Sequence, residues 1–285
     1  MWLGAHIRTS DGLAEAARVG HTIGCEAIQI FSKSPHSWKA PPIRPESAEE
    51  FRAAVPAERL RSTAIHHAYL TNLATPKAGM LKTSRAAFLD EIHRADLLAV
   101  DHVIFHPGAH MGTGVEKGCA QIAESLNWVA AETPDSKVRI LLENAAGQGT
   151  TIGSKLEELA SILERLTAKD RFGVTIDTCH LFASGVDFRT AEQYGAVKDL
   201  IRDTIGTKKV RAFHLNDSKA ECGGHLDRHQ NIGKGAIGTA GFAHWLNDPT
   251  WAKLPGFLET PLESEDYSEY VQDLQTLRGL LQPPA

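Results

Sequence analysis

Residues 138–180 contain the unit that decides the fold: the apolar run VRILLEN (138–144), the amphipathic stretch KLEELASILERL (155–166) and a second apolar run, FGVTIDTCH (172–180). The two runs are short and rich in Val, Ile and Leu, as expected for strands covered on both faces of a sheet. The stretch between them has apolar residues at helical spacing. A strand, a helix and another strand in this order indicate a βαβ unit with parallel strands.

The same alternation continues in both directions along the chain. The expected strands are 2–7, 27–31, 62–67, 102–106, 138–144, 172–180, 210–217 and 256–260. The expected helices are 11–24, one beginning near Glu46, 78–100, 115–132, 155–166, 190–205, 240–247 and 266–281. Eight such pairs predict an α/β fold, a closed (β/α)8 TIM barrel, with a doubly wound sheet as the alternative. Because no linker or charge block divides the chain, we expect residues 1–285 to form a single TIM-barrel domain that ends in a frayed tail at 282–285.

The composition argues against several classes of protein. A formal net charge of −5 is unlike a broadly basic nucleic-acid coat protein, although it allows a DNA enzyme whose positive field is local. The N-terminal residues MWLGAH include no basic segment followed by an apolar run, and no stretch is long enough to cross a membrane. We therefore expect a cytoplasmic protein without membrane contact. The four cysteines form no CxxC pair and are expected to be reduced thiols.

Residues able to bind a metal gather at the ends of the expected strands, where TIM barrels carry their chemistry. The candidates are His66, His106, Glu143, Asp177, His180, His214, Asp227, His229 and Glu259. Any one of them could be a structural hydrogen-bonding group or a helix cap, but their convergence on one rim favours a metal site. Carboxylates at a partly buried rim repel each other and are costly to desolvate, and cations relieve both problems. Imidazole and carboxylate together suit zinc and its first-row neighbours.

The number of candidates bears on the number of ions. A catalytic zinc ion usually keeps three protein ligands and one open position, so nine ligands could serve three ions, or two ions with more ligands each. A cluster of this kind is suited to displacement at phosphorus, because it can deprotonate water, orient it in line and neutralise the leaving oxygen.

Several segments together resemble the endonuclease IV family. They are FHPG (105–108), LENAAGQG (142–149), IDTCH (176–180), HLNDSK (214–219), and DRH (227–229) followed by IGKG (232–235). The resemblance extends over nearly the whole chain, and all nine ligand positions are filled. It implies a DNA-repair endonuclease that hydrolyses the phosphodiester 5′ to abasic sites and leaves a 3′-hydroxyl. Trimming of damaged 3′ ends is implied as a further activity, and we expect a monomer acting on double-stranded DNA.

The resemblance also implies three zinc ions per chain, with manganese as an alternative at some positions. The implied ligand sets are His66, His106 and Glu143; Glu143, Asp177, His214 and Glu259; and His180, Asp227 and His229. Glu143 and Glu259 are the implied catalytic carboxylates. The first bridges two zinc ions, and the second lies where it could position or deprotonate the water that attacks as a metal-bridging hydroxide. The third zinc ion is implied to stabilise the leaving 3′ oxygen.

Expected DNA contacts lie in loops beside this rim. They are Lys33, His36, Trp38, Tyr69, Leu70 and Arg228. Tyr69 and Leu70 are expected to fill the gap left by a missing base, unless they only pack on the next helix. His36 stands where the family usually has arginine, which leaves the strength of DNA distortion open. His67 stands where an acidic residue is usual, and the sequence gives no account of this change.

Other functions remain as alternatives. The segment GKGAIG (233–238) fits a dinucleotide-binding pattern, but a polar loop separates it from the preceding strand. Its glycines are expected to approach DNA phosphates instead. A metal-dependent sugar isomerase or epimerase on a related barrel would use one or two ions, so zinc content would distinguish it. A non-catalytic DNA-binding protein would not cleave an abasic duplex, with or without chelator.

Overall fold

The computed structural model describes residues 1–282 and confirms the predicted barrel; the last three residues of the expected tail lie outside the described part. Eight parallel strands close into a barrel in the order β1-β10-β7-β6-β5-β4-β3-β2. They are β1 (Trp2–Ile7), β2 (Ala27–Ile30), β3 (Ser62–His66), β4 (His102–Phe105), β5 (Arg139–Glu143), β6 (Phe172–Asp177), β7 (Val210–His214) and β10 (Pro255–Leu258). Each strand thus pairs with its neighbour in the chain, as consecutive right-handed βα units require.

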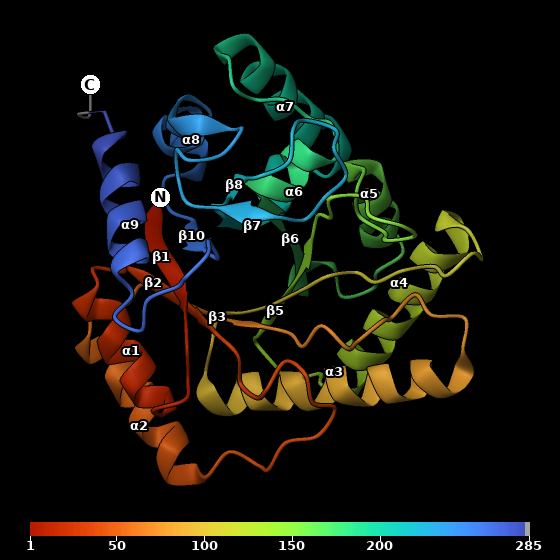
Figure 1. The fold of residues 1–285 in the computed structure, drawn as a ribbon. Helices are drawn as coiled ribbons and strands as arrows, with labels where there is room; N and C mark the ends of the chain where they lie inside the picture. Colours follow the sequence, from red (N-terminus) through yellow and green to blue (C-terminus); the bar gives the residue numbers. More distant parts are fainter. Residues whose placement is uncertain (283–285) are drawn as a thin grey trace.

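Helices surround the strands (Figure 1). They are α1 (Leu13–Thr22), α2 (Pro45–Ala57), α3 (Ala78–Leu98), α4 (Val115–Glu132), α5 (Leu156–Glu164), α6 (Thr178–Ala183), α7 (Ala191–Thr204), α8 (Gly238–Asn247) and α9 (Ser268–Gly279). Short 3-10 turns are η1 (Lys169–Arg171), η2 (Thr207–Lys209) and η3 (Pro249–Trp251). Among residues 1–282, no helix has the combination of length and hydrophobicity needed to cross a bilayer.

Two predicted strands end three residues earlier than expected, and the other ends differ by at most two residues. The strand predicted over 172–180 stops at Asp177, and the Asp177 carboxylate caps helix α6 by accepting the backbone N–H of His180 at 2.8 Å. His180 therefore lies on a helix and not on a strand. The strand predicted over 210–217 stops at His214. The residues after it form β8 (Asp217–Ser218), which pairs antiparallel with β9 (His229–Gln230) and so fixes both ends of the intervening loop.

The core has two layers. Inside the barrel lies a small cluster, here called the inner cluster, made of Ala27, Ala64, Ile104, Leu141, Ala212 and Phe257. Between strands and helices lies a larger apolar layer that includes the fully buried Trp245 and Trp251. Burying a large apolar side chain contributes about 1.5–3 kcal/mol, so this layer holds the strands in register and keeps their carboxyl ends at one rim.

Candidate metal centre

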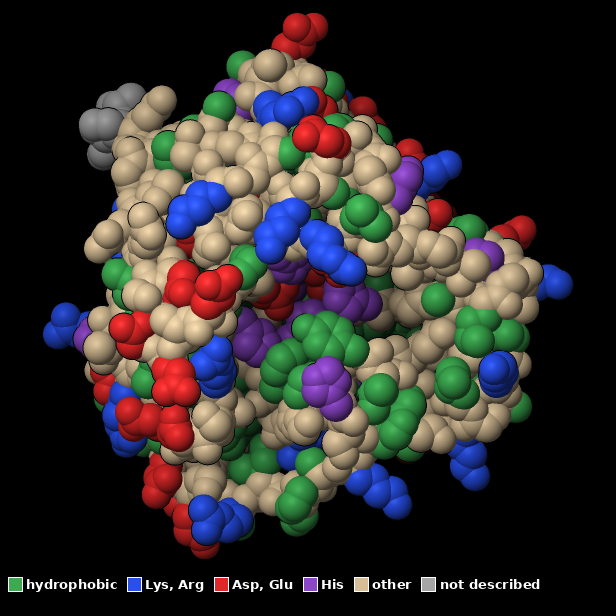
Figure 2. Space-filling model, viewed as in Figure 1, with side chains coloured by type: hydrophobic (Ala, Val, Ile, Leu, Met, Phe, Trp, Pro, Cys, Tyr) green, Lys and Arg blue, Asp and Glu red, His purple; other side chains and the backbone are tan. Residues whose placement is uncertain are grey.

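The structure brings the nine predicted ligand residues together in three adjacent groups, two of which share Glu143. The groups are His66, His106 and Glu143; Glu143, Asp177, His214 and Glu259; and His180, Asp227 and His229. Within each group the atoms able to bind a metal lie within 4.8 Å of one another. Figure 2 shows histidine and acidic side chains gathered in a hollow near the middle of one face. The grouping matches the three ligand sets implied by the sequence, while the binding of metal stays a prediction.

Glu143 lies at the centre of the three groups and is fully buried. Its Oε2 is 3.1 Å from Nε2 of His66, and its Oε1 is 3.0 Å from Nδ1 of His214 and 3.2 Å from Nδ1 of His180. Burial alone would raise the pKa of this carboxyl, but His106, His214 and His180 outweigh burial and hold the pKa well below its usual range. Glu143 is therefore an ionised carboxylate shared among several imidazoles.

The ring nitrogens of His180 and His229 show that this arrangement fits a cation. Nδ1 of His180 is 3.0 Å from the carbonyl of Asn144, and Nδ1 of His229 is 3.0 Å from the carbonyl of Glu259, so each Nδ1 carries the hydrogen. In the neutral rings the two Nε2 lone pairs then face each other at 3.4 Å, with Oδ1 of Asp227 within 3.3 Å of both. Three facing electron pairs repel each other unless a cation or proton lies between them.

His214 repeats this situation on the other side of the centre. Its Nε2 donates to Oε1 of Gln29 at 2.9 Å, so Nδ1 has a lone pair in the neutral ring. That lone pair faces carboxylate oxygens of Glu143 at 3.0 Å, Glu259 at 3.4 Å and Asp177 at 3.7 Å. Gln29 also donates to Oε1 of Glu259 at 2.6 Å. The sequence did not single out Gln29, although a buried glutamine in the apolar strand AIQI was the available signal.

Two asparagines hold the carboxylates in place. The side chain of Asn216 donates to Oδ2 of Asp177 at 2.7 Å and accepts the backbone N–H of Glu259 at 2.8 Å. The Asn144 side chain accepts the backbone N–H of Asp177 at 2.7 Å and donates to its carbonyl at 3.1 Å. Outer contacts of this kind orient metal ligands and fix their hydrogen-bonding state.

Cys179 also lies near the centre, with Sγ close to ligand atoms of Asp177 and His229. Its thiol donates to the carbonyl of Arg228 at 3.7 Å. Burial, helped by the charge of Asp177, raises the pKa of this thiol to about 12. Cys179 is not among the ligands predicted from the sequence, and with Asp177 and His229 it forms a fourth group within ligand distance.

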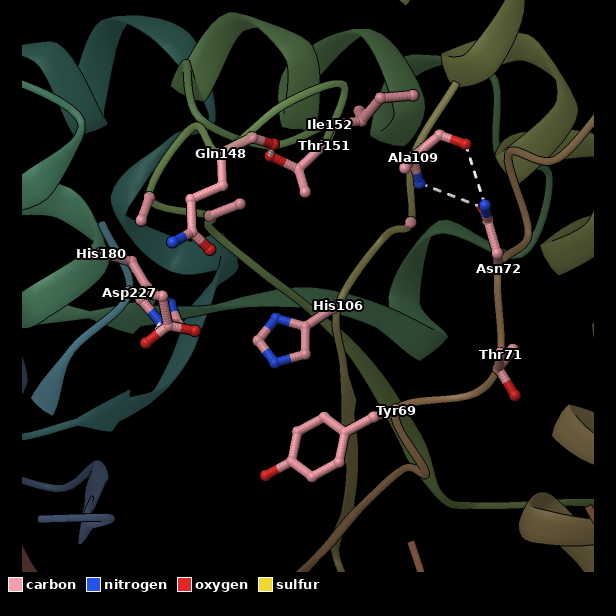
Figure 3. A pocket seen from close by; sticks show the side chains of 13 residues that line it. Tyr69, Thr71, Asn72, His106, Ala109, Gln148, Thr151, Ile152, His180 and Asp227 are labelled. Carbon is pink, nitrogen blue, oxygen red and sulfur yellow. Dashed lines mark hydrogen bonds and ion pairs between the residues drawn. The ribbon is translucent and has the colours of Figure 1, made fainter. Parts of the chain in front are cut away.

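A cavity of about 330 Å³ opens beside the centre. Figure 3 shows His106, His180 and Asp227 on one side of it, and Tyr69 with its ring below that of His106. The centroids of these two rings are 6.1 Å apart, and the ring planes are inclined by 26° to each other. Tyr69 is 56% exposed. The remaining wall includes the small side chains of Ala145 and Ala146.

The predicted DNA contacts divide into two kinds. His36, Tyr69 and Arg228 are exposed, while Trp38 and Leu70 are half-buried. The imidazole of His36 lies 6.5 Å from the ring of Tyr69 between centroids, so the two loops meet beside the cavity.

The structure gives Lys33 a different role from the predicted DNA contact. Its side chain is buried, and its ammonium group is 2.7 Å from Asp90 and 3.6 Å from Glu91 on helix α3. The same Glu91 accepts from Nδ1 of His67 at 2.9 Å. A paired, buried ammonium group does not reach DNA, so Lys33 instead fixes the loop after β2. The network also accounts for His67, whose partner carboxylate comes from α3 rather than from the strand end.

The glycine-rich segment 233–238 also has a different role from the expected one. Asp217 is fully buried, and its carboxylate accepts the backbone N–H groups of Gly233 at 2.9 Å, Gly235 at 3.0 Å and Ile237 at 3.0 Å. These donors are therefore occupied within the protein and are not free for DNA phosphates. A Cβ on Gly235 would lie 2.5 Å from Oδ1 of Asp217, which explains the glycine at that position.

A pH prediction follows from His214 in protein stripped of metal. Burial lowers the pKa of this imidazole, but Glu259 and Glu143 outweigh burial and raise it to about 9 from 6.5. A folded-state pKa above the unfolded value stabilises the fold below pH 6.5, and that stabilisation is lost as the pH rises through about 9. We expect the melting temperature of metal-free protein to fall between pH 6.5 and pH 9.

The control for this experiment is the zinc-loaded protein, in which a bound cation takes the place of the proton. Its melting temperature is expected to depend much less on pH across the same range. Equal pH dependence of the two forms would contradict the assignment of these carboxylates and imidazoles to one cation-binding centre.

Comparisons with known proteins agree with this geometry. Residues 17–280 match the xylose isomerase-like TIM barrel family. The chain is 39% identical over 279 residues to "Probable endonuclease 4" of Chloroflexus aurantiacus, covering 98% of both chains. Among solved structures, endonuclease IV from Thermus thermophilus is similar with a TM-score of 0.85 and 31% identity, covering 98% of both chains. D-psicose 3-epimerase from Clostridium cellulolyticum has a TM-score of 0.72 at 14% identity over 99% of this chain and all of that one, a likeness of fold alone.

Proposed function

The chain belongs to the endonuclease IV family within the xylose isomerase-like TIM barrels and is a phosphodiester-cleaving nuclease, and we propose that it incises DNA on the 5′ side of abasic sites and leaves a 3′-hydroxyl. The observation that carries this proposal is the set of three adjacent ligand groups, two of which share Glu143 while the third approaches it through His180 at 3.2 Å. We further propose that the whole chain acts as one catalytic domain and as a monomer, so that the rim is free to dock on a duplex.

The donor set fits zinc, with manganese as an alternative at some positions. The residues that would hold three ions are those of the three groups described above. When bound, the ions would supply an activated water molecule and neutralise charge on the scissile phosphate. The task of the protein is to hold the ligands, exclude bulk water and orient the substrate. The ligand side chains of Glu143 and Asp177 are held in place because both are fully buried and hydrogen-bonded.

Glu259 is the residue best placed to act on the attacking water. It is 15% exposed, whereas the Glu143 side chain is fully buried, so Glu259 can meet solvent. His214, His6 and His66 outweigh burial and keep the pKa of Glu259 well below its usual range. An ionised carboxylate at this place can accept a hydrogen bond from water and fix its direction of attack.

Recognition of the lesion is proposed to depend on the cavity and on Tyr69. A sugar without a base is smaller than a complete nucleotide, and the wall formed by Ala145 and Ala146 leaves room for it beside His106 and Asp227. The exposed ring of Tyr69, with Leu70 beside it, can occupy the space of the missing base. Arg228 and His36 lie on exposed loops from which they can contact phosphates.

The direct test combines elemental analysis with an incision assay. We expect about three zinc ions per chain, cleavage 5′ to the lesion in a duplex with a tetrahydrofuran site, loss of cleavage with chelator and recovery with zinc. The same duplex without a lesion is the control. A duplex carrying a 3′-phosphate tests the proposed end trimming. One or two ions per chain without incision would favour the sugar isomerase alternative, and binding without cleavage in the zinc-loaded protein would favour the non-catalytic one.

A further inference from the structure

The amino ends of the barrel strands enclose a second cavity, of about 270 Å³, at the end opposite the metal centre. Its lining is strongly cationic: it includes Arg61, Arg139, Arg211 and Lys253, with Asp101 as the one acidic residue. Such an excess of positive charge contrasts with the net charge of −5 for the whole chain. Nothing in the proposed nuclease reaction uses this end of the barrel.

The recess lies at the mouth of the barrel, where Arg61, Arg139 and Lys253 are exposed and His102 is buried. Side chains alternate along a strand, and His102 and Arg139 stand two positions before Ile104 and Leu141, which are members of the inner cluster. The two residues are also register partners on β4 and β5. The inward-facing row of β4 and β5 therefore ends, toward the amino ends of the strands, in a buried histidine and an exposed arginine.

The charges of this cavity are incompletely compensated. Arg61 lies 3.5 Å from Glu26, and the Asp101 carboxylate accepts from Ser62 and from the backbone N–H of Thr63 at 2.8 Å. Among residues 1–282, no carboxylate forms an ion pair with Arg139, Arg211 or Lys253. Two arginines and a lysine around one recess repel each other, and an anion between them would remove that repulsion.

His102 gives an independent indication of a ligand. The residue is only 6% exposed and lines the cavity, and its Nδ1 is buried without a hydrogen-bond partner among the described atoms. Burial, together with the charges of Arg139 and Arg211, lowers the pKa of this imidazole to about 4 although Asp101 opposes the shift, so the ring is neutral. An unpartnered buried polar group is costly, and a ligand in the recess that His102 lines would be a source of the missing partner.

We propose that this recess is a binding site for a phosphate group carried by a small molecule, held by Arg139, Arg211 and Lys253 with His102 at its inner wall. Guanidinium groups match the geometry of phosphate oxygens through paired hydrogen bonds, and a neutral imidazole adds a donor. The volume of the recess exceeds that of phosphate alone, so a phosphomonoester also fits. The net negative charge of the chain and the narrow recess disfavour a nucleic-acid backbone on this face.

The test is calorimetric titration of metal-loaded protein at constant ionic strength in chloride. The probes are inorganic phosphate and adenosine 5′-monophosphate, which distinguish a free anion from a nucleotide. The test variant is the double substitution Arg139→Gln and Arg211→Gln. The matched control is the double substitution Arg18→Gln and Arg202→Gln, which removes two exposed arginines that already pair with carboxylates on α1 and α7.

The probe to compare is the one that wild type binds more tightly. We expect the test variant to bind this probe at least about 10-fold more weakly than wild type, because two charge-assisted contacts are lost. The control variant is expected to bind like wild type. Incision of an abasic duplex is expected to be unchanged in both variants, which shows that phosphate binding at the metal centre is not the quantity that changed. If the double variant fails to fold, Lys253→Gln, at an exposed position, should weaken binding about 3-fold. Unchanged affinity for both probes in the folded variants would overturn the proposal.

Discussion

Replacing Glu259 with glutamine is expected to slow incision of an abasic duplex by about 10²- to 10⁴-fold while leaving DNA binding intact. Glutamine has the same size and shape, so the contact from Gln29 at 2.6 Å and the backbone contact with Asn216 at 2.8 Å can both persist. What disappears is the negative charge that can accept a hydrogen bond from the attacking water. Removing a negative charge from a surface that meets DNA does not weaken binding.

Single-turnover incision and gel-shift binding on the same duplex measure the two quantities separately. The matched control is Glu263→Gln, which removes an exposed carboxylate from the loop after β10 without touching the metal centre. The zinc content of the Glu259 variant should also be measured. A loss of zinc would show that Glu259 is a ligand needed to hold the metal, so that the slower incision would come from an empty site. Wild-type turnover in a zinc-replete variant would remove Glu259 from the mechanism.

The barrel could be predicted because its signal is local. The run VRILLEN (138–144) is long enough for one strand and the stretch KLEELASILERL (155–166) has helical spacing, and both became β5 and α5 with small changes at the ends. The ligand positions followed from the same reasoning, since residues at the carboxyl ends of parallel strands meet at one rim. A histidine at such an end, as in His66 or His214, therefore indicates a candidate metal ligand before any contact in the structure is known.

The errors at strand ends have a local physical cause. Periodicity describes which residues are apolar, and TCHLFA (178–183) is apolar enough to continue a strand. The chain turns into α6 instead because the Asp177 carboxylate accepts the N–H of His180. From the sequence, Asp177 could be a capping residue or a candidate metal ligand; the structure shows the cap and also places its carboxylate in the group with Glu143, His214 and Glu259.

Long-range pairing is the reason why the contacts of Lys33, Gln29 and the glycine-rich loop could not be predicted from the sequence. Lys33 follows a strand in a loop expected to contact DNA, but its partners Asp90 and Glu91 come from a distant helix. Gln29 connects His214 to Glu259 only because β2 lies across the barrel from β7 and near β10. Such partners are fixed by the packing of helices and by barrel closure, which no window of sequence contains.

Replacing Asp217 with alanine is expected to lower the free energy of unfolding by about 4 kcal/mol, among the largest effects of any single substitution in this chain. The carboxylate is fully buried and accepts five backbone N–H groups, those of Ser218, Gly233, Gly235, Ile237 and Gly238. Each buried donor left without an acceptor costs about 1–3 kcal/mol, and water entering the loop would offset part of the sum. Denaturant unfolding of the metal-free protein measures the change.

The matched control is Asp199→Ala on α7, whose side chain is 61% exposed, with an expected change within about 0.5 kcal/mol. The two variants should also differ in function. Asp217 lies on β8, which pairs with His229 on β9, so loss of the carboxylate loosens the loop that carries Asp227 and His229. The ligand group of His180, Asp227 and His229 should then lose its ion before the other two groups, and zinc content should fall by about one ion in three. A change in stability below about 1 kcal/mol with full zinc content would mean that the glycine-rich loop holds its conformation without this carboxylate.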